Sequence, residues 1–323
     1  MNDAECTAAA APFQGYMPFR FVLLTHVILG IIGISLSIYS LGVVRRSFFH
    51  PNCKILLLAI VALFIAHGVG LSVPFSYHVY AYSTMTGCQL MVSEAVCDII
   101  RAPANFAVFG CSSLHFGLCL ERIMARYYAR RYETMRPIFG WGLLGASLLT
   151  TALIYAYCLH REDFSMMVPY CTLGNANTGD QLDRVLKILP SIDLASVIVM
   201  VYLAATTKNS KKTYDLGASF SKLEGRSANR LLLPFTIVHL VIGLGSVFLN
   251  GYLPGIMPAS WTFELRRTVL AGINLISVYA IVGCLTLLYI LRNIQRKRRQ
   301  KIFKILTPIN DTSVIHNTYA QHW

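Results

Sequence analysis

The sequence predicts an all-α membrane protein, a bundle of seven transmembrane helices with an extracellular N-terminus and a cytoplasmic C-terminus. Three observations lead to this fold class. Of the 323 residues, 55% are hydrophobic and only 13% are charged, whereas soluble domains carry roughly 25% charged residues. The apolar residues gather in seven blocks, and the basic residues gather in alternate loops between those blocks.

Each block is long enough to cross a bilayer, because a transmembrane helix needs about 20 mostly apolar residues. The seven blocks are 21–44, 54–77, 97–121, 138–159, 187–207, 231–252 and 268–291. We expect no cleavable leader before the first block, because residues 1–20 begin with acidic Asp3 and Glu5 and contain no basic run. We therefore expect an extracellular segment at 1–20, a seven-transmembrane domain at 21–291 and a basic cytoplasmic tail at 292–323.

The direction of threading follows from the basic residues, which collect in cytoplasmic loops of membrane proteins. One set of alternate loops, with the tail, holds 21 of the 28 lysines and arginines. This set is Arg45, Arg46, Lys54, Arg122, Arg126, Arg130, Arg131, Arg136, Lys208, Lys211, Lys212, Lys222, Arg226, Arg230, Arg292, Arg296, Lys297, Arg298, Arg299, Lys301 and Lys304. The bias places these loops and the tail in the cytoplasm.

The net charge of +13 is explained by this topology, so no nucleic-acid partner is expected. No pair of histidines or cysteines has the spacing of a metal site, and we predict neither a metal nor a cofactor. A retinal Schiff base is excluded because block 268–291 contains no lysine. The motifs of intramembrane metalloproteases and serine hydrolases are absent from the sequence, which argues against an enzyme.

Three cysteines fall in or beside the predicted outer loops, where oxidation is allowed. A disulfide between Cys97 and Cys171 would join the start of the third helix to the loop after the fourth. Cys88 is an alternative partner for Cys171, and free thiols are the remaining alternative. The sequence alone leaves the pairing open.

Glu121 and Arg122 stand side by side where the third block ends. A charge near the membrane interior costs roughly 2.5–3.5 kcal/mol and is usually paired and functional. A guanidinium that is paired with its neighbouring carboxylate cannot contact another protein. Once released, it can reach a partner that inserts between the helices, and a ligand-controlled switch requires two such states. The alternative is a solvated helix end without a function.

The segment CQLMVSEAVCDIIRAPANFAVFGCSSLHFGLCLERIMARYYARRYE, residues 88–133, resembles the nematode serpentine chemoreceptors of the Sra superfamily, especially the Srab class of these G-protein-coupled receptors. The features that carry the resemblance are Cys88, Cys97, Arg101, Pro103, Asn105, Phe106, Glu121, Arg122, Ala125, Arg131, Tyr132 and Glu133. The segments YCTLGN (170–175) and SKLEGRSANRLLLP (221–234) also fit. The Asn-Pro-x-x-Tyr motif of rhodopsin-like receptors is missing, so only the Glu-Arg element is carried over.

The resemblance implies a chemosensory receptor that binds a small-molecule or peptide cue outside the cell and activates a heterotrimeric G protein. It implies a switch at Glu121 and Arg122, with Arg126 among the basic residues that face the G protein. It also implies display in the plasma membrane of sensory cilia on chemosensory neurons. The alternative function is a membrane transporter or a ligand-gated channel subunit.

Polar residues in the outer halves of the helices are candidates for a ligand pocket. They are Arg101, Asn105, Asp193, His239 and Asn274. A plainer interpretation is that Asp98 and Arg101, three residues apart on one helix face, pair with each other, and that His239 only packs. In the tail, residues 292–306 mix basic and apolar side chains, which favours an amphipathic helix lying on anionic lipid.

Overall fold

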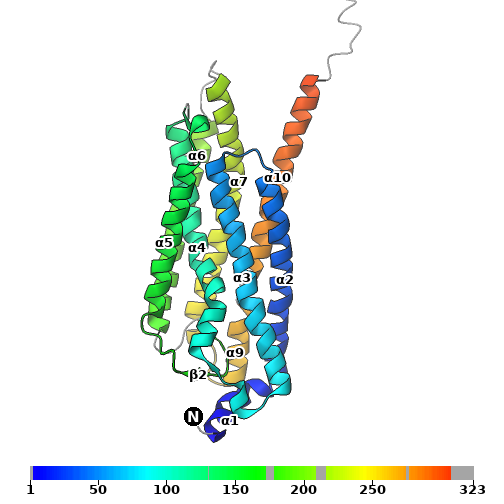
Figure 1. The fold of residues 1–323 in the computed structure, drawn as a ribbon, viewed down its shortest axis with the longest axis vertical. Helices are drawn as coiled ribbons and strands as arrows, with labels where there is room; N and C mark the ends of the chain where they lie inside the picture. Colours follow the sequence, from blue (N-terminus) through cyan, green and yellow to red (C-terminus); the bar gives the residue numbers. More distant parts are fainter. Residues whose placement is uncertain (1–2, 130, 172–177, 209–215, 274–275, 307–323) are drawn as a thin grey trace, which may run out of the picture.

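The computed structural model describes residues 3–129, 131–171, 178–208, 216–273 and 276–306. In these ranges it contains seven helical spans long and apolar enough to cross a membrane, so the predicted seven-helix membrane fold is confirmed (Figure 1). The spans are formed by α2 (Met17–Arg45), α3 (Pro51–Thr84), α4 (Glu94–Tyr127), α5 (Ile138–Leu159), α6 (Gly179–Lys208), α7 (Leu216–Val247), and α9 (Phe263–Gly272) together with α10 (Ile276–Leu306).

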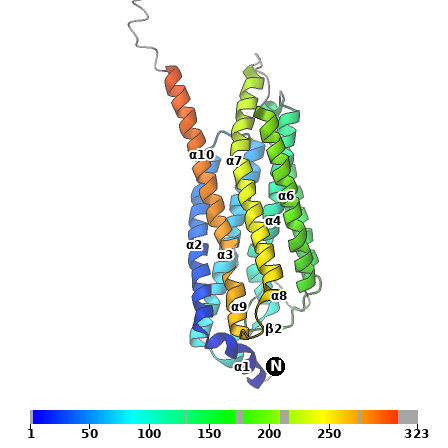
Figure 2. The same ribbon diagram turned by 180° about the vertical axis from the view of Figure 1, so that it is seen from behind.

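Shorter elements connect the spans. They are α1 (Asp3–Gln14), the 3-10 helices η1 (Gly87–Leu90) and η2 (Tyr132–Thr134), the π-helical turn η3 (Phe248–Tyr252) and α8 (Leu253–Ile256). Strands β1 (Val92–Ser93) and β2 (Met167–Val168) pair antiparallel, with Val92 opposite Val168. We call the end of the bundle that carries α1 the α1 end, and the end where α10 stops the α10 end (Figures 1 and 2).

Helix α4 lies inside the bundle, in contact with α3, α5, α6 and α7. Its buried residues run from Glu94 at the α1 end to Arg122 at the α10 end. The outward faces of the other helices expose large apolar side chains, such as Leu153, Ile198 and Tyr202, each at least 60% exposed. A surface of this kind suits lipid and would be unfavourable in water.

The helices extend past most of the predicted apolar blocks because helical hydrogen bonding continues where hydropathy falls. The N-terminus of α3 is fixed locally, since Pro51 takes the first helical position and the His50 ring accepts from the Asn52 backbone N–H at 3.3 Å. Helix α10 continues along its own axis to Leu306 and projects beyond the bundle (Figure 1). Residues 292–306 are helical, as expected, but they continue α10 instead of forming a helix of their own, and their contact with lipid stays a prediction.

Gly70 lies where the backbone of α3 closely approaches that of α4. A Cβ atom at Gly70 would lie 2.6 Å from the backbone N of Ala104, whereas a Cβ atom at Gly145 in α5 would meet nothing within 4 Å. We expect Gly70→Ala to lower stability by about 1–3 kcal/mol through overpacking and Gly145→Ala to be neutral. Melting temperatures of the two purified variants in detergent test this. Equal melting temperatures would contradict the close packing of α3 on α4.

Candidate functional site

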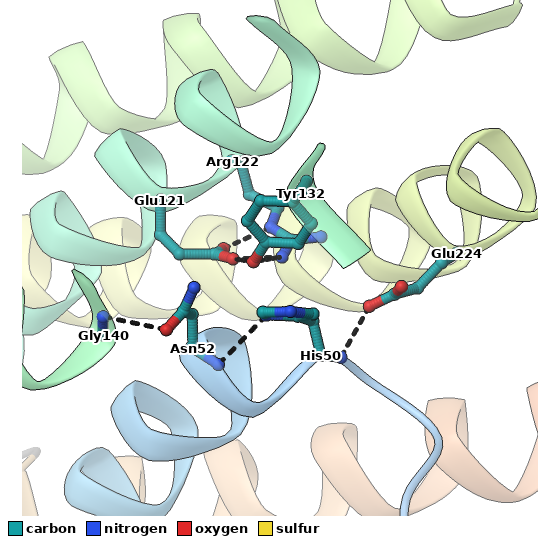
Figure 3. Close-up of polar contacts among 7 residues, drawn as sticks. All are labelled: His50, Asn52, Glu121, Arg122, Tyr132, Gly140 and Glu224. Carbon is teal, nitrogen blue, oxygen red and sulfur yellow. Dashed lines mark hydrogen bonds and ion pairs between the residues drawn. The ribbon is translucent and has the colours of Figure 1, made fainter. Parts of the chain in front are cut away.

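A buried charged pair lies at the α10 end of α4. The Nε and Nη2 atoms of Arg122 donate to the two carboxylate oxygens of Glu121. The Tyr132 hydroxyl donates to Glu121 and accepts from Arg122 Nη2 at 3.2 Å (Figure 3). Glu121 is 0%, Arg122 3% and Tyr132 2% exposed, so the pair is not a solvated helix end.

The local sequence explains how three polar groups meet here. Helix α4 ends at Tyr127, and the short turn that follows brings η2 back, so that Tyr132 returns over the last buried turn of the helix. The Arg122 guanidinium also lies 5.8 Å from the centre of the Tyr132 ring. Breaking such a buried pair by removing one partner typically costs about 3–5 kcal/mol.

His50 and Glu224 connect the pair to two other helices. The His50 ring lies 4.2 Å from the Tyr132 ring, and the His50 backbone N–H donates to Glu224 Oε1 of α7 at 2.6 Å (Figure 3). Burial, together with the positive charges of Arg122 and Lys54, lowers the pKa of His50 to about 4. His50 is therefore neutral at physiological pH and packs beside Arg122 without charge repulsion.

Asn52 links the same region to α5. Its side-chain oxygen accepts from the Gly140 backbone N–H at 3.0 Å (Figure 3), and a Cβ atom at Gly140 would lie 2.7 Å from Asn52 Cα. Together with His50 and Glu224, this contact makes the pair the meeting point of the starts of α3, α5 and α7. No signal in the sequence indicated a role for His50, Asn52 or Glu224. Tyr132 was noted only as one of the residues that carry the family resemblance.

Arg126 lies one turn beyond Arg122, and its side chain is exposed. Other predicted basic residues of this surface, Arg130, Lys211 and Lys212, lie outside the described residues. Beside the pair, a cavity of about 270 Å³ opens between α7 and α10. Its polar lining includes Glu224, Ser227, Arg230, Asn293, Lys297 and Arg298, and its apolar lining includes Phe48, Pro234, Ile290 and Ile294.

A second polar cluster lies in the interior of the bundle. Ser112 of α4 donates to Asp193 Oδ2 of α6 at 3.1 Å, and its hydroxyl lies 3.1 Å from His239 Nε2 of α7. His239 Nε2 is also 3.3 Å from Asp193 Oδ1. The rings of His115 and His239 stack 4.2 Å apart. Three helices are thus held together by one buried network.

This network forms one side of a small cavity of about 70 Å³ among α3, α4, α6, α7 and α10. The cavity walls are mostly apolar, but four of the side chains that line it carry buried polar atoms without a hydrogen-bond partner: His67 Nε2, Asp193 Oδ1, Ser246 Oγ and Tyr279 OH. His67 Nδ1 lies 3.3 Å from the Ala104 carbonyl oxygen and must donate to it, so the unpartnered Nε2 is an acceptor. Unpartnered polar groups beside an apolar space are characteristic of ligand sites.

Of the predicted pocket residues, the structure brings Asp193 and His239 together. Arg101 lies elsewhere, where its buried guanidinium donates to the Cys171 carbonyl oxygen. Asn105 is buried with its Nδ2 unpartnered and does not line the cavity. Asn274 lies outside the described residues. No ion pair joins Asp98 to Arg101 in the described part of the chain, so the interpretation of these two as a pair is wrong.

The disulfides lie at the α1 end. Cys97 at the start of α4 is bonded to Cys171, and Cys88 is bonded to Cys6 of α1 rather than to Cys171. The other five cysteines are free and buried. The Cys6 partner was missed because no sequence signal indicated that α1 folds back under η1.

Comparison with known proteins gives a consistent result. The family model for serpentine type 7TM GPCR receptor class ab chemoreceptors matches residues 5–320. Serpentine receptor class beta-17 of Caenorhabditis elegans is 22% identical over 284 residues, 81% of this chain and 75% of that protein. Serpentine receptor class beta-5 of the same organism is 23% identical over 263 residues, 79% and 76% of the two chains. Serpentine receptor class alpha-39 is 25% identical over 205 residues, 62% and 55%.

Proposed function

Because the chain belongs to the serpentine class ab chemoreceptor family of G-protein-coupled receptors, we propose that it binds an external chemical cue and activates a heterotrimeric G protein. The observation that carries the proposal is the separation of two buried polar centres along one bundle. An interior cavity is suited to a ligand, and a buried Glu121–Arg122 pair lies at the α10 end.

The proposed orientation places the α1 end outside the cell and the α10 end in the cytoplasm. The distribution of lysine and arginine supports it. The positions of the cysteines support it independently, because both disulfides lie at the α1 end and disulfides persist in oxidising compartments. The family further suggests the plasma membrane of sensory cilia as the site of display.

The proposed cue site is the cavity beside Asp193 and His239. Its fixed acceptors, Asp193 Oδ1 and His67 Nε2, favour a small cue that donates hydrogen bonds from an otherwise apolar body. A water needs about 10–15 Å³ on the same measure, so a cavity of about 70 Å³ suits a molecule of only a few heavy atoms.

The proposed relay runs through α4, α6 and α7. Ser112 and Arg122 belong to one helix, with ten residues or about 15 Å between them. A cue that binds better when Ser112, Asp193 and His239 are separated would shift the helices toward an open arrangement. Opening at the α10 end would free Arg122 for the G protein, which also meets the basic cavity between α7 and α10.

The test is a screen of small volatile and water-soluble compounds in cells that express the chain with a promiscuous G protein. For a compound that signals, we expect Asp193→Asn to raise the half-maximal concentration at least tenfold, because a charge-assisted hydrogen bond contributes about 1.5–3 kcal/mol. Asp183→Asn, at an exposed position of the same helix, is the matched control. A response to a compound as ion flux in cells without G proteins would favour the channel alternative instead.

A further inference from the structure

Three carboxylates meet at the α1 end of the bundle, away from both centres described above. Glu94 and Asp98 come from the first turns of α4, and Glu162 comes from the segment between α5 and β2. One carboxylate oxygen of each lies within 4.8 Å of the others. Glu94 is 1% and Asp98 6% exposed, and Glu162 is partly exposed.

The two buried carboxylates are not neutralised by the part of the chain that the structure describes. Neither side chain has a hydrogen bond or an ion pair there, and Glu94 Oε2 and Asp98 Oδ2 are fully enclosed without a partner. Arg101 is near enough to interact electrostatically with both, but its guanidinium donates to the Cys171 carbonyl oxygen. Buried charges without partners are strongly unfavourable, so the two carboxyl groups must either be protonated or face a ligand of positive charge.

The charge and size of the cluster specify the class of ligand. Three carboxylates and the one guanidinium leave a formal charge of −2, which one divalent cation balances. Calcium takes oxygen ligands at about 2.3–2.6 Å, so oxygens on opposite sides of the ion are about 5 Å apart. Three oxygens within 4.8 Å of one another can therefore all contact a single calcium ion, and carboxylates bind it mono- or bidentately.

We propose that Glu94, Asp98 and Glu162 form a calcium site at the α1 end of the receptor. Partly exposed Glu162 provides the entry route for the ion. The expectation of no metal came from the spacing of histidines and cysteines, and it did not consider acids brought together from separate segments. Extracellular calcium sites bind in the range of about 10⁻⁴–10⁻³ M, so the site is filled when this end faces the outside.

The bound ion would act as a second cross-link between α4 and the segment that joins α5 to α6, in addition to the Cys97–Cys171 disulfide. The disulfide holds the far end of the segment between α5 and α6 to α4, and the ion would hold its beginning at Glu162. Thr178, just before α6, donates to Glu162 Oε2 at 3.1 Å. Calcium at this position would therefore join α4 to the connection that leads into α6, the helix that carries Asp193.

The test uses the full-length protein purified in detergent at pH 7.5, without cue or G protein, so its outcome is independent of the proposed signalling function. We expect calcium chloride to raise the melting temperature by several degrees with half-saturation between about 0.1 and 1 mM, since a ligand that binds only the folded state stabilises it by mass action. Isothermal titration should give one ion per chain.

Glu162→Gln and Asp98→Asn should each weaken calcium binding at least tenfold, while Glu264→Gln, a partly exposed acid in α9 at the same end, should bind like the parent. If Asp98→Asn fails to fold because Asp98 is buried, Glu162→Gln still tests the site, since Glu162 is partly exposed and lies in a connecting segment. The proposal would be contradicted if calcium did not change the melting temperature of the unmutated protein, or if potassium chloride at matched ionic strength raised it equally. Protons would then be the species that neutralises the carboxylates.

Discussion

Replacing Glu121 with glutamine is expected to raise signalling in the absence of any cue by severalfold, and replacing Arg122 with glutamine is expected to abolish signalling with or without the cue. In the structure the guanidinium is held by both oxygens of Glu121 and by Tyr132, and the proposed mechanism takes this arrangement as the inactive state. Glutamine keeps the shape of Glu121 but removes the charge, so the state with Arg122 released becomes more populated. Under the proposed mechanism, the Arg122 variant lacks the group that would contact the G protein.

The measurement is second-messenger output at equal surface level, with surface level read from an N-terminal tag. Arg45→Gln, an exposed arginine at the same end of the bundle, is the matched control and should signal normally. Tyr132→Phe is a milder variant that removes one donor to Glu121 and keeps the ring, and it should raise basal output less than Glu121→Gln does. An Arg122 variant that responds normally would remove this pair from the mechanism.

Loss of the Cys97–Cys171 disulfide is expected to have the second largest effect, a strong fall in both surface display and melting temperature. The bridge closes a loop with a sequence separation of 74 residues, for which loop-closure entropy gives about 4 kcal/mol of stabilisation. It also positions the carbonyl of Cys171 that accepts from the buried Arg101. Cys97→Ser would therefore remove the bridge and, with it, a constraint on the carbonyl that the buried Arg101 contacts.

The Cys6→Ser variant provides the comparison, because the Cys6–Cys88 bridge spans a similar separation of 82 residues but holds α1, which lies under the bundle (Figure 1). We expect its melting temperature to fall less than that of Cys97→Ser, because α1 contributes less to the core. Differential scanning fluorimetry with and without reductant measures the melting temperatures of the two variants, and surface staining measures their display. If the two variants lose equal stability, the segment between α5 and α6 is not held chiefly by Cys97.

The seven spans and the pairing of Glu121 with Arg122 were predictable, because apolar length and adjacent charges are read directly along the chain. What could not be predicted depends on how each helix is rotated about its axis. Asp193 and His239 were candidates, yet nothing in the sequence indicated that Ser112 would join them from a third helix. Arg101 was assigned to a pocket and to Asp98, but its partner is a backbone carbonyl, which carries no residue-specific signal.

The residues around the Glu121–Arg122 pair also could not be predicted from the sequence. His50 and Tyr132 lie outside the membrane-spanning helices, where hydropathy carries little information, and their rings meet across 82 positions of the chain. Glu94, Asp98 and Glu162 at the α1 end could each be identified in the sequence as a charged residue. Their convergence depends on the path of the segment after α5, which no periodic pattern specifies.

The state of the cysteines has a practical consequence for spectroscopy. All nine lie in the described ranges, four in the two bridges and five as buried thiols. A polar, membrane-impermeant maleimide should therefore find little to react with on the native chain. A single cysteine introduced at an exposed position such as Arg45 or Arg126 would accept a fluorophore or spin label selectively, so that distances between helix ends become measurable without first removing the native thiols.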